Sequence, residues 1–186
     1  LSVNEEAVHG LPSWRKLRAG DILSVDVGAT LDGWVGDSAI TVAVGVCSEQ
    51  AQGVIAAAHD GLMAAIAAAR VGASIGDLGA AVEAIVRPRG YDILREYCGH
   101  GIGRSLHEDP QVPNFGETGT GPIIASGWCL AIEPIVTTGS ARVVTLPDGW
   151  TVVTRDGGLA AHAELAIAIT AAGVEILSLT SAGELP

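Results

Sequence analysis

The sequence predicts an α+β domain in which an antiparallel sheet is divided between two distant parts of the chain. Short β-branched runs separated by turn residues extend over 20–46 and again over 128–170, a pattern typical of antiparallel strands. In part of the segment between these two regions, apolar residues recur at the intervals of an α-helix. The two strand regions are also imperfect copies of one another. A length of 186 residues and a hydrophobic fraction of 48% suit one domain with its own core.

The repeat consists of two pairs of matching segments, 20–26 with 127–133 and 37–42 with 164–169. Each copy carries two carboxylates, which are Asp26 and Asp37 in the first, and Glu133 and Glu164 in the second. An Asp-Gly-Trp triplet lies between the two carboxylates of each copy. A two-fold axis relating the copies would bring all four carboxylates to one place, where cations must offset their mutual repulsion. The sequence therefore predicts a metal centre.

Strand alternation places these four carboxylates on one face among small residues, which leaves room for ions and substrate. On the first strand, Asp26 shares this face with Ser24 and Gly28. The opposite face holds apolar side chains that we expect to enter a core, namely Leu23, Val25 and Val27.

Two helices are expected between the strand regions. The first covers 48–70, with a serine at its first position as N-cap and Gly72 just past its end. The second covers 74–87, where Ser74 and Asp77 have the spacing of a capping box and a glycine follows three residues later as the stop.

A strand over 91–97 and a His-Gly pair at 100–101 follow the second helix. The first copy has the corresponding pair His9-Gly10, but the two helices that should precede it are missing. By symmetry alone, we expect the 186 residues to be the C-terminal portion of a longer domain or an unusually short natural version of it.

The composition argues against several classes of partner. Ten Lys and Arg against twenty-one Asp and Glu give a net charge of -11, which repels nucleic acid and anionic membrane surfaces. The most apolar stretch, 54–71, is interrupted by His59, Asp60 and Gly61 and falls short of a membrane span. The three cysteines are too scattered for a disulfide scaffold or a CxxC zinc site, so we expect a cytoplasmic protein.

One histidine, His100, stands among glycines in the segment 99–103, and His107 follows seven residues later. Glycine lets the backbone approach a ligand closely at such a position. Together, two Asp, two Glu and one His suit a pair of divalent cations in a mostly oxygen shell. Aminopeptidases are among the enzymes that use such a pair to activate water.

Several motifs in combination resemble one family. They are 97–112 with its Gly-His-Gly, Ile132-Glu133-Pro134, Asp148-Gly149-Trp150-Thr151, and 4–10 with its final His9-Gly10. The combination is highly specific, covers essentially the whole chain and is similar to the methionine aminopeptidases of type I. No long insertion interrupts the second half, which argues against type II. The resemblance implies the pita-bread fold, a curved antiparallel sheet backed by helices, with halves related by pseudo-two-fold symmetry.

Carried onto matching positions, the resemblance implies five metal ligands, which are Asp26, Asp37, His100, Glu133 and Glu164. They would hold two divalent metal ions, such as Co, Mn, Fe or Zn. The resemblance further implies that Glu133 shuttles a proton, and that His9 and His107 contact substrate rather than metal. Trp150 aligns with an aromatic wall of the methionine pocket, a core tryptophan being the alternative, and Leu106 stands where the family usually has phenylalanine.

The implied reaction is hydrolysis of the N-terminal methionine from nascent polypeptides by a cytoplasmic monomer, with contact to the ribosome left open. Around Glu164 the chain departs from the family pattern, which has an aromatic residue before this Glu and His-Thr after it. The departing sequence is His162-Ala163-Glu164-Leu165-Ala166. His162 is either a partner that orients a metal ligand or an ordinary surface histidine.

Two other functions stay open. A pita-bread peptidase acting on Xaa-Pro bonds would use the same metal ligands, although His9 and the segment Asp148-Gly149-Trp150-Thr151 favour the methionine enzyme. The second is a non-catalytic peptide-binding or protein-binding module, because function does not follow from fold. Such modules typically lose ligands, whereas all five are present here.

Overall fold

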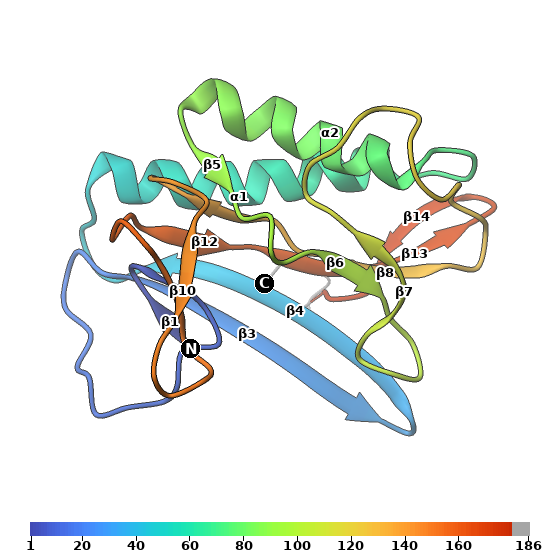
Figure 1. Ribbon diagram of the computed structural model, residues 1–186. Coiled ribbons are helices and arrows are strands. Elements are labelled where there is room, and N and C mark those ends of the chain that lie inside the picture. The colour runs from blue at the N-terminus through green and yellow to red at the C-terminus, as the bar shows by residue number, and fades with distance from the viewer. Residues whose placement is uncertain (180–186) are drawn as a thin grey trace.

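The central feature of the fold is a curved antiparallel sheet with two helices on one side (Figure 1). The computed structural model describes residues 1–179, so residues 180–186 of the predicted domain lie outside the described part. Strands follow one another in the order β1-β3-β4-β13-β8-β6-β7, and β14 pairs with β13 beside them. Their bounds are β1 Ser2–Val3, β3 Ile22–Leu31, β4 Trp34–Ala43, β6 Gly99–Gly101, β7 Glu108–Val112, β8 Cys129–Ile132, β13 Glu164–Thr170 and β14 Gly173–Ile176. The two sequence copies meet where β4 pairs with β13.

Two three-stranded sheets, β10-β11-β2 and β12-β9-β5, complete the strands. Their bounds are β2 Glu6–Val8, β5 Asp92–Ile93, β9 Ile135–Thr137, β10 Val143–Thr145, β11 Val152–Thr154 and β12 Ala160–His162. The prediction of a strand over 91–97 is therefore wrong in length, because β5 is shorter. Only Asp92 and Ile93 pair with β9, and the chain leaves the sheet after Leu94 donates to the carbonyl of Ile135.

Both predicted helices are present, as α1 (Glu49–Ala68) and α2 (Ile75–Val86). The side chain of Ser48 caps α1 by accepting a hydrogen bond from the amide of Ala51. This helix ends two residues before the predicted end, because Ala69 adopts an extended backbone.

The predicted capping box of α2 is confirmed in both directions. The Ser74 hydroxyl accepts from the amide of Asp77 at 3.2 Å, and the Asp77 carboxylate accepts from the amide of Ser74 at 2.7 Å. A 3-10 turn, η1 (Arg87–Arg89), follows the helix and ends at Gly90, whose φ of +81° lies in the left-handed region that glycine favours.

The main core lies between the two helices and one face of β8 and β13. On β13, Leu165, Ile167 and Ile169 are buried in one cluster with the apolar sides of α1 and α2. Alternation turns Glu164 to the other face of the same strand. By length and composition α1 matches a membrane span, but its apolar face belongs to this core.

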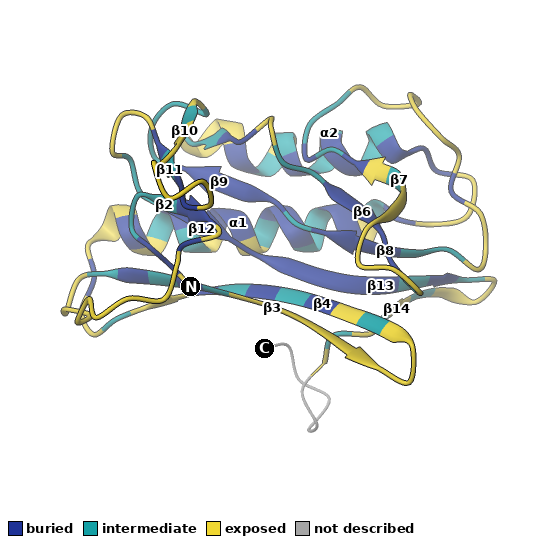
Figure 2. Cartoon of the chain, turned by 60° about the horizontal axis from the view of Figure 1, so that its bottom comes forward, coloured by how far each residue is buried: buried dark blue, intermediate teal, exposed yellow. Residues whose placement is uncertain are grey.

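The prediction that Leu23, Val25 and Val27 enter a core is wrong. Leu23 and Val25 are half-buried, and Val27 is 56% exposed. In the described residues, both helices lie mainly over the strands of the other half, so this face of β3 and β4 is largely open (Figure 2). The buried position on this part of β3 is Ser24, on the face that also carries Asp26.

Candidate metal centre

Four of the five predicted ligands lie on strands of the central sheet. Asp26 lies on β3, Asp37 on β4, Glu164 at the start of β13 and His100 at the centre of β6. Ala39 pairs with Asp26 on one side and with Glu164 on the other. Because paired residues share a face, the two carboxylates flank this alanine on the inner face, where its small side chain leaves space between them.

The fifth predicted ligand, Glu133, lies at a break in a longer pair of strands. Glu133 and Pro134 separate β8 from β9, and Ala163 separates β12 from β13. Asn114 is 1% exposed and donates its side-chain amide to the main-chain carbonyl of Glu133 at 3.0 Å, which holds the break in place. The two glutamates of the second copy therefore lie where the regular hydrogen bonding between paired strands is interrupted.

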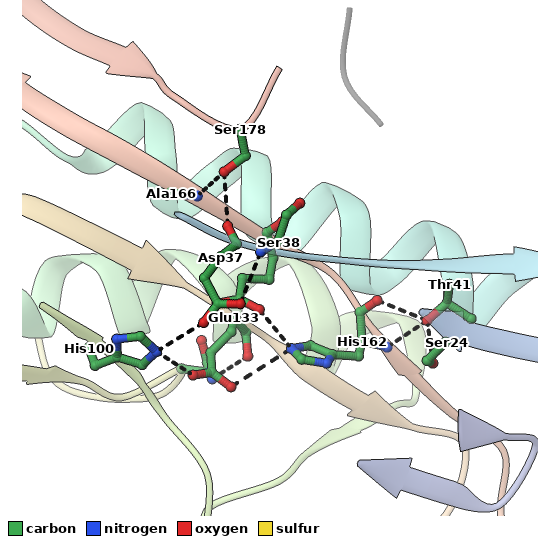
Figure 3. Close-up of polar contacts among 11 residues, drawn as sticks. Ser24, Asp37, Ser38, Thr41, His100, Glu133, His162, Ala166 and Ser178 are labelled. Atoms are coloured by element: carbon green, nitrogen blue, oxygen red, sulfur yellow. Dashed lines mark hydrogen bonds and ion pairs between the residues drawn. The ribbon is translucent and has the colours of Figure 1, made fainter. Parts of the chain in front are cut away.

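The side chains of Asp37, His100 and Glu133 converge (Figure 3). Nε2 of His100 lies 3.8 Å from Oδ2 of Asp37 and 3.7 Å from Oε1 of Glu133. Ligating atoms of Asp37, His100 and Glu164 all lie within 4.8 Å of one another. All three residues are buried. The structure thus brings together residues that are more than 100 positions apart in the sequence.

Burial and mutual repulsion oppose ionisation of the carboxyl groups. Burial, followed by the charges of Asp26 and Asp37, raises the pKa of Glu133 to about 8. Burial, followed by the charges of Glu133, Asp37 and Asp26, raises the pKa of Glu164 to about 10. The pKa of Asp37 is also raised, by burial and by the charge of Asp26. These shifts are the expected signature of a negative cluster without compensating charge.

The donor set fits divalent cations. Oε1 of Glu164 is buried and has no hydrogen-bond partner within the described part of the chain, an arrangement that is costly unless something binds the oxygen. Carboxylate oxygens with an imidazole nitrogen are ligands that Mn, Fe, Co and Zn ions accept. Bound cations would also favour the ionised form of each carboxyl, which reverses the upward pKa shifts.

His162 also lies in this centre, so the alternative of an ordinary surface histidine is wrong. Its side chain is 3% exposed, and burial lowers its pKa to about 4. Nε2 lies 3.7 Å from Oε2 of Glu133 and 3.8 Å from Oε2 of Glu164 (Figure 3). The sequence contained the signal, since residues two apart along a strand share a face and His162 stands two before Glu164.

The predicted substrate histidine His107 lies on one side of the centre. Its ring lies 4.5 Å from the ring of His100, edge to face, and both residues line a hollow of about 580 Å³. Leu106 stands nearby and is 39% exposed; a Cβ built on Gly28 would lie 3.5 Å from its Cδ1.

The other predicted substrate residues, His9 and Trp150, lie on the opposite side. Their rings are 6.1 Å apart, and both line a hollow of about 270 Å³ together with Asp26 and His162. Trp150 is 62% exposed, so the alternative of a core tryptophan is wrong. The carboxylates are thus flanked by two hollows, each with a histidine that is not among the predicted ligands.

Comparisons with known proteins agree with this geometry. The family model "Metallopeptidase family M24" matches residues 1–171. A methionine aminopeptidase of Clostridium perfringens is 46% identical over 179 residues, which are 96% of this chain and 72% of the relative. The crystal structure of a methionine aminopeptidase from Thermotoga maritima superposes with a TM-score of 0.93 at 47% identity, over 95% of this chain and 72% of that chain.

A more distant likeness gives the fold alone. Prolidase from Pyrococcus furiosus superposes with a TM-score of 0.73 at 23% identity, over 97% of this chain and 48% of that chain. The predicted pita-bread fold is confirmed by the shared curved sheet and its covering helices.

Proposed function

The chain belongs to metallopeptidase family M24, and we propose that it is an aminopeptidase that removes N-terminal methionine from polypeptides. The observation that carries this proposal is the convergence of Asp37, His100, Glu133 and Glu164, with Asp26 beside them, on one face of the sheet. A chain that kept only the fold for binding would have no need of two buried carboxyl groups, Asp37 and Glu164, because each is costly without a counter-charge.

Two divalent metal ions would be held by Asp26, Asp37, His100, Glu133 and Glu164. The donor set admits Mn, Fe, Co or Zn ions. When bound, such ions supply a water of lowered pKa and polarise the carbonyl of the scissile bond.

Residues of the chain handle the proton and the substrate. Glu133 lies within the centre, where its carboxyl can take a proton and deliver it to the nitrogen of the leaving peptide. His107, beside His100, is placed to donate a hydrogen bond to the oxygen on which negative charge develops. His9, across the centre, is placed to hold the peptide from the other hollow.

The methionine side chain would lie in the hollow that His9 and Trp150 line. The indole of Trp150 gives this hollow an aromatic wall, which suits a thioether because sulfur makes favourable contacts with aromatic rings. Leu106 lies near Gly28 on the side of His107, where it would contact the peptide rather than the methionine side chain. The free cysteines Cys47, Cys98 and Cys129 fit the reducing cytoplasm, where nascent polypeptides are the source of this substrate.

The experiment that tests the proposal measures metal content and peptide cleavage in one purified sample. We expect the metal-free protein to be inactive, and added Co²⁺ or Mn²⁺ to restore release of methionine from Met-Ala-Ser. A Xaa-Pro peptide assayed in parallel separates the rival peptidase, since cleavage of that peptide alone would contradict our assignment. Metal binding without hydrolysis of either peptide would instead favour a non-catalytic binding module.

A further inference from the structure

His162 occupies a fixed position at the end of β12. Its main-chain amide donates to Oγ1 of Thr41, and the Thr41 hydroxyl donates back to its main-chain carbonyl, both at 2.8 Å. Oγ of Ser24 contacts the same hydroxyl at 2.7 Å. Two strands of the first copy therefore hold the backbone of this histidine from the second copy, and its ring has little freedom to leave the centre.

The ring nitrogen Nε2 of His162 is buried and makes no hydrogen bond to residues 1–179. Its neighbours are Oε2 of Glu133 at 3.7 Å and Oε2 of Glu164 at 3.8 Å, which are too far for a direct hydrogen bond. A buried polar atom that faces two carboxylate oxygens without contacting either is costly, unless a further group lies between them.

The position of His162 mirrors that of His100. Nε2 of His100 lies 3.7 Å from Oε1 of Glu133, and Nε2 of His162 lies 3.7 Å from Oε2 of the same carboxylate (Figure 3). Each oxygen of Glu133 therefore faces one imidazole nitrogen. His100 has Asp37 as its second carboxylate neighbour, and His162 has Glu164.

We propose that His162 is an additional metal ligand, which gives an imidazole nitrogen to the cation position bounded by Glu133, Glu164 and Asp26. The inference rests on the proposed function, since it requires the metal centre described above. Ligand atoms 2.0–2.2 Å from one cation lie roughly 3 to 4 Å from each other, the range that the two measured distances occupy. Asp26 lines the same hollow as His162 and flanks Ala39 opposite Glu164.

An imidazole at each cation position changes which metals the centre prefers. A site of carboxylate oxygens alone suits Mn or Mg, whereas added imidazole nitrogen favours Co, Zn, Ni or Fe. We therefore expect this chain to bind its second Co²⁺ or Zn²⁺ more tightly, relative to Mn²⁺, than the variant without the His162 ring does.

The test is a titration of the metal-free full chain with Co²⁺, followed by calorimetry and by the visible absorption of the bound ion. We expect two binding events in the wild type. In both variants, His162→Ala and His162→Gln, one of the two binding events should weaken by about tenfold or more. The visible absorption of the Co²⁺ ion bound in that event should also change, because an oxygen donor replaces nitrogen. His59→Ala is the matched control, since His59 lies on the exposed side of α1, and it should leave both events unchanged.

Either of two results would overturn the assignment of His162. Unchanged binding and absorption in His162→Gln would show that nitrogen is not a ligand. Full recovery in His162→Gln of what His162→Ala loses would mean that the side chain only positions a carboxylate through a hydrogen bond. A wild type that binds no Co²⁺ would instead contradict the proposed function itself. Far-ultraviolet circular dichroism identifies a variant that fails to fold, and the near-isosteric glutamine variant then decides.

Discussion

The two halves of the central sheet carry equivalent inner faces and different outer faces. β3 and β4 contribute Asp26 and Asp37 to the centre, as the second copy contributes Glu133 and Glu164. On the outer face of β13, Ile167 is fully buried beneath the helices. On the corresponding face of β3 and β4, Leu23 and Val25 are half-buried and four other apolar side chains are exposed: Val27 at 56%, Leu31 at 75%, Trp34 at 56% and Val42 at 40%.

The covered and the exposed parts of the outer face meet along β4 and β13. A hollow of about 400 Å³ opens there, lined by Ile40 of β4, Ile55 of α1 and Leu165 of β13 among others. The open face of β3 and β4 begins at this boundary.

This difference shows that the direction of the carboxylates on the inner face does not depend on whether the outer face of the same strand is covered. Alternation along a strand is enough to turn Asp26 and Asp37 inward, whether or not the other face is covered. Stability depends on the covered face, since burial of apolar surface is the main favourable term in folding. We therefore expect substitutions on the inner faces of the two halves to act alike, and substitutions on the outer faces to act differently.

The first prediction, which has the largest expected effect, is that the inner faces of both halves are equally necessary for activity. Asp37→Asn from the open half and Glu164→Gln from the covered half should each lower kcat/KM for Met-Ala-Ser more than about 100-fold, because even residues that only orient a ligand cost 10–100-fold. Steady-state kinetics with metal analysis of each variant measures this. Asp60→Asn, on the exposed side of α1, is the control. A normal rate in Asp37→Asn would show that Asp37, and with it β4, does not contribute to the active site.

The second prediction compares the outer faces. Ile167→Ala, beneath the helices, should lower the free energy of unfolding by about 2–5 kcal/mol, because it leaves a cavity in the core. Val27→Ala removes two methyl groups from an exposed position and should cost less than about 1 kcal/mol. Urea unfolding of both variants gives the two values. Equal losses would mean that the face of β3 is covered in solution.

The third prediction concerns pH, and it isolates the covered half. Because the folded-state pKa values of Glu133 and Glu164 are raised to about 8 and about 10, the folded metal-free chain binds more protons than the unfolded chain above pH 4.5. His162, whose pKa is lowered to about 4, acts in the opposite direction below about pH 6.5 but offsets only part of this effect. The stability of the metal-free chain should therefore fall as pH rises from about 5 to 8, by on the order of 5 kcal/mol.

Thermal unfolding of the metal-free protein across this pH range measures the loss. Glu164→Gln should flatten the dependence, since glutamine does not titrate. Saturating Co²⁺ should also flatten it and raise stability by roughly 2.7 kcal/mol at a hundredfold excess over Kd. Stability that rises from pH 5 to 8 in the metal-free protein would contradict the raised pKa values of Glu133 and Glu164.

The sequence predicted what local spacing controls. The repeat placed Asp26, Asp37 and Glu164 on one face, because strand period and pairing leave few other arrangements, and it placed Glu133 directly after β8. The helix starts were also predicted, since a cap depends on residues three positions apart.

What escaped prediction depends on contacts between distant segments. Alternation shows that Leu23, Val25 and Val27 share a face, but it does not show whether anything covers that face. The burial of His162 depends on Thr41, which lies 121 residues away, so alternation could place this histidine on the face of Glu164 but could not show that its ring is buried. The strand expected over 91–97 is shortened because its pairing with β9 stops at Ile93.

The smallest expected effect tests how much the helical cover itself contributes. Ser74→Ala removes the cap of α2, so the amide of Asp77 loses its side-chain acceptor, and the free energy of unfolding should fall by about 1 kcal/mol. Ser126→Ala, at an exposed loop position, is the matched control and should change it by less than about 0.5 kcal/mol. Because α2 covers only the second half, hydrogen exchange should rise first in α2 and in the strands beneath it, with β3 and β4 unaffected. Equal exchange gains in both halves would instead mean that the sheet opens as one unit, and that the uneven cover seen in the structure has no counterpart in its local stability.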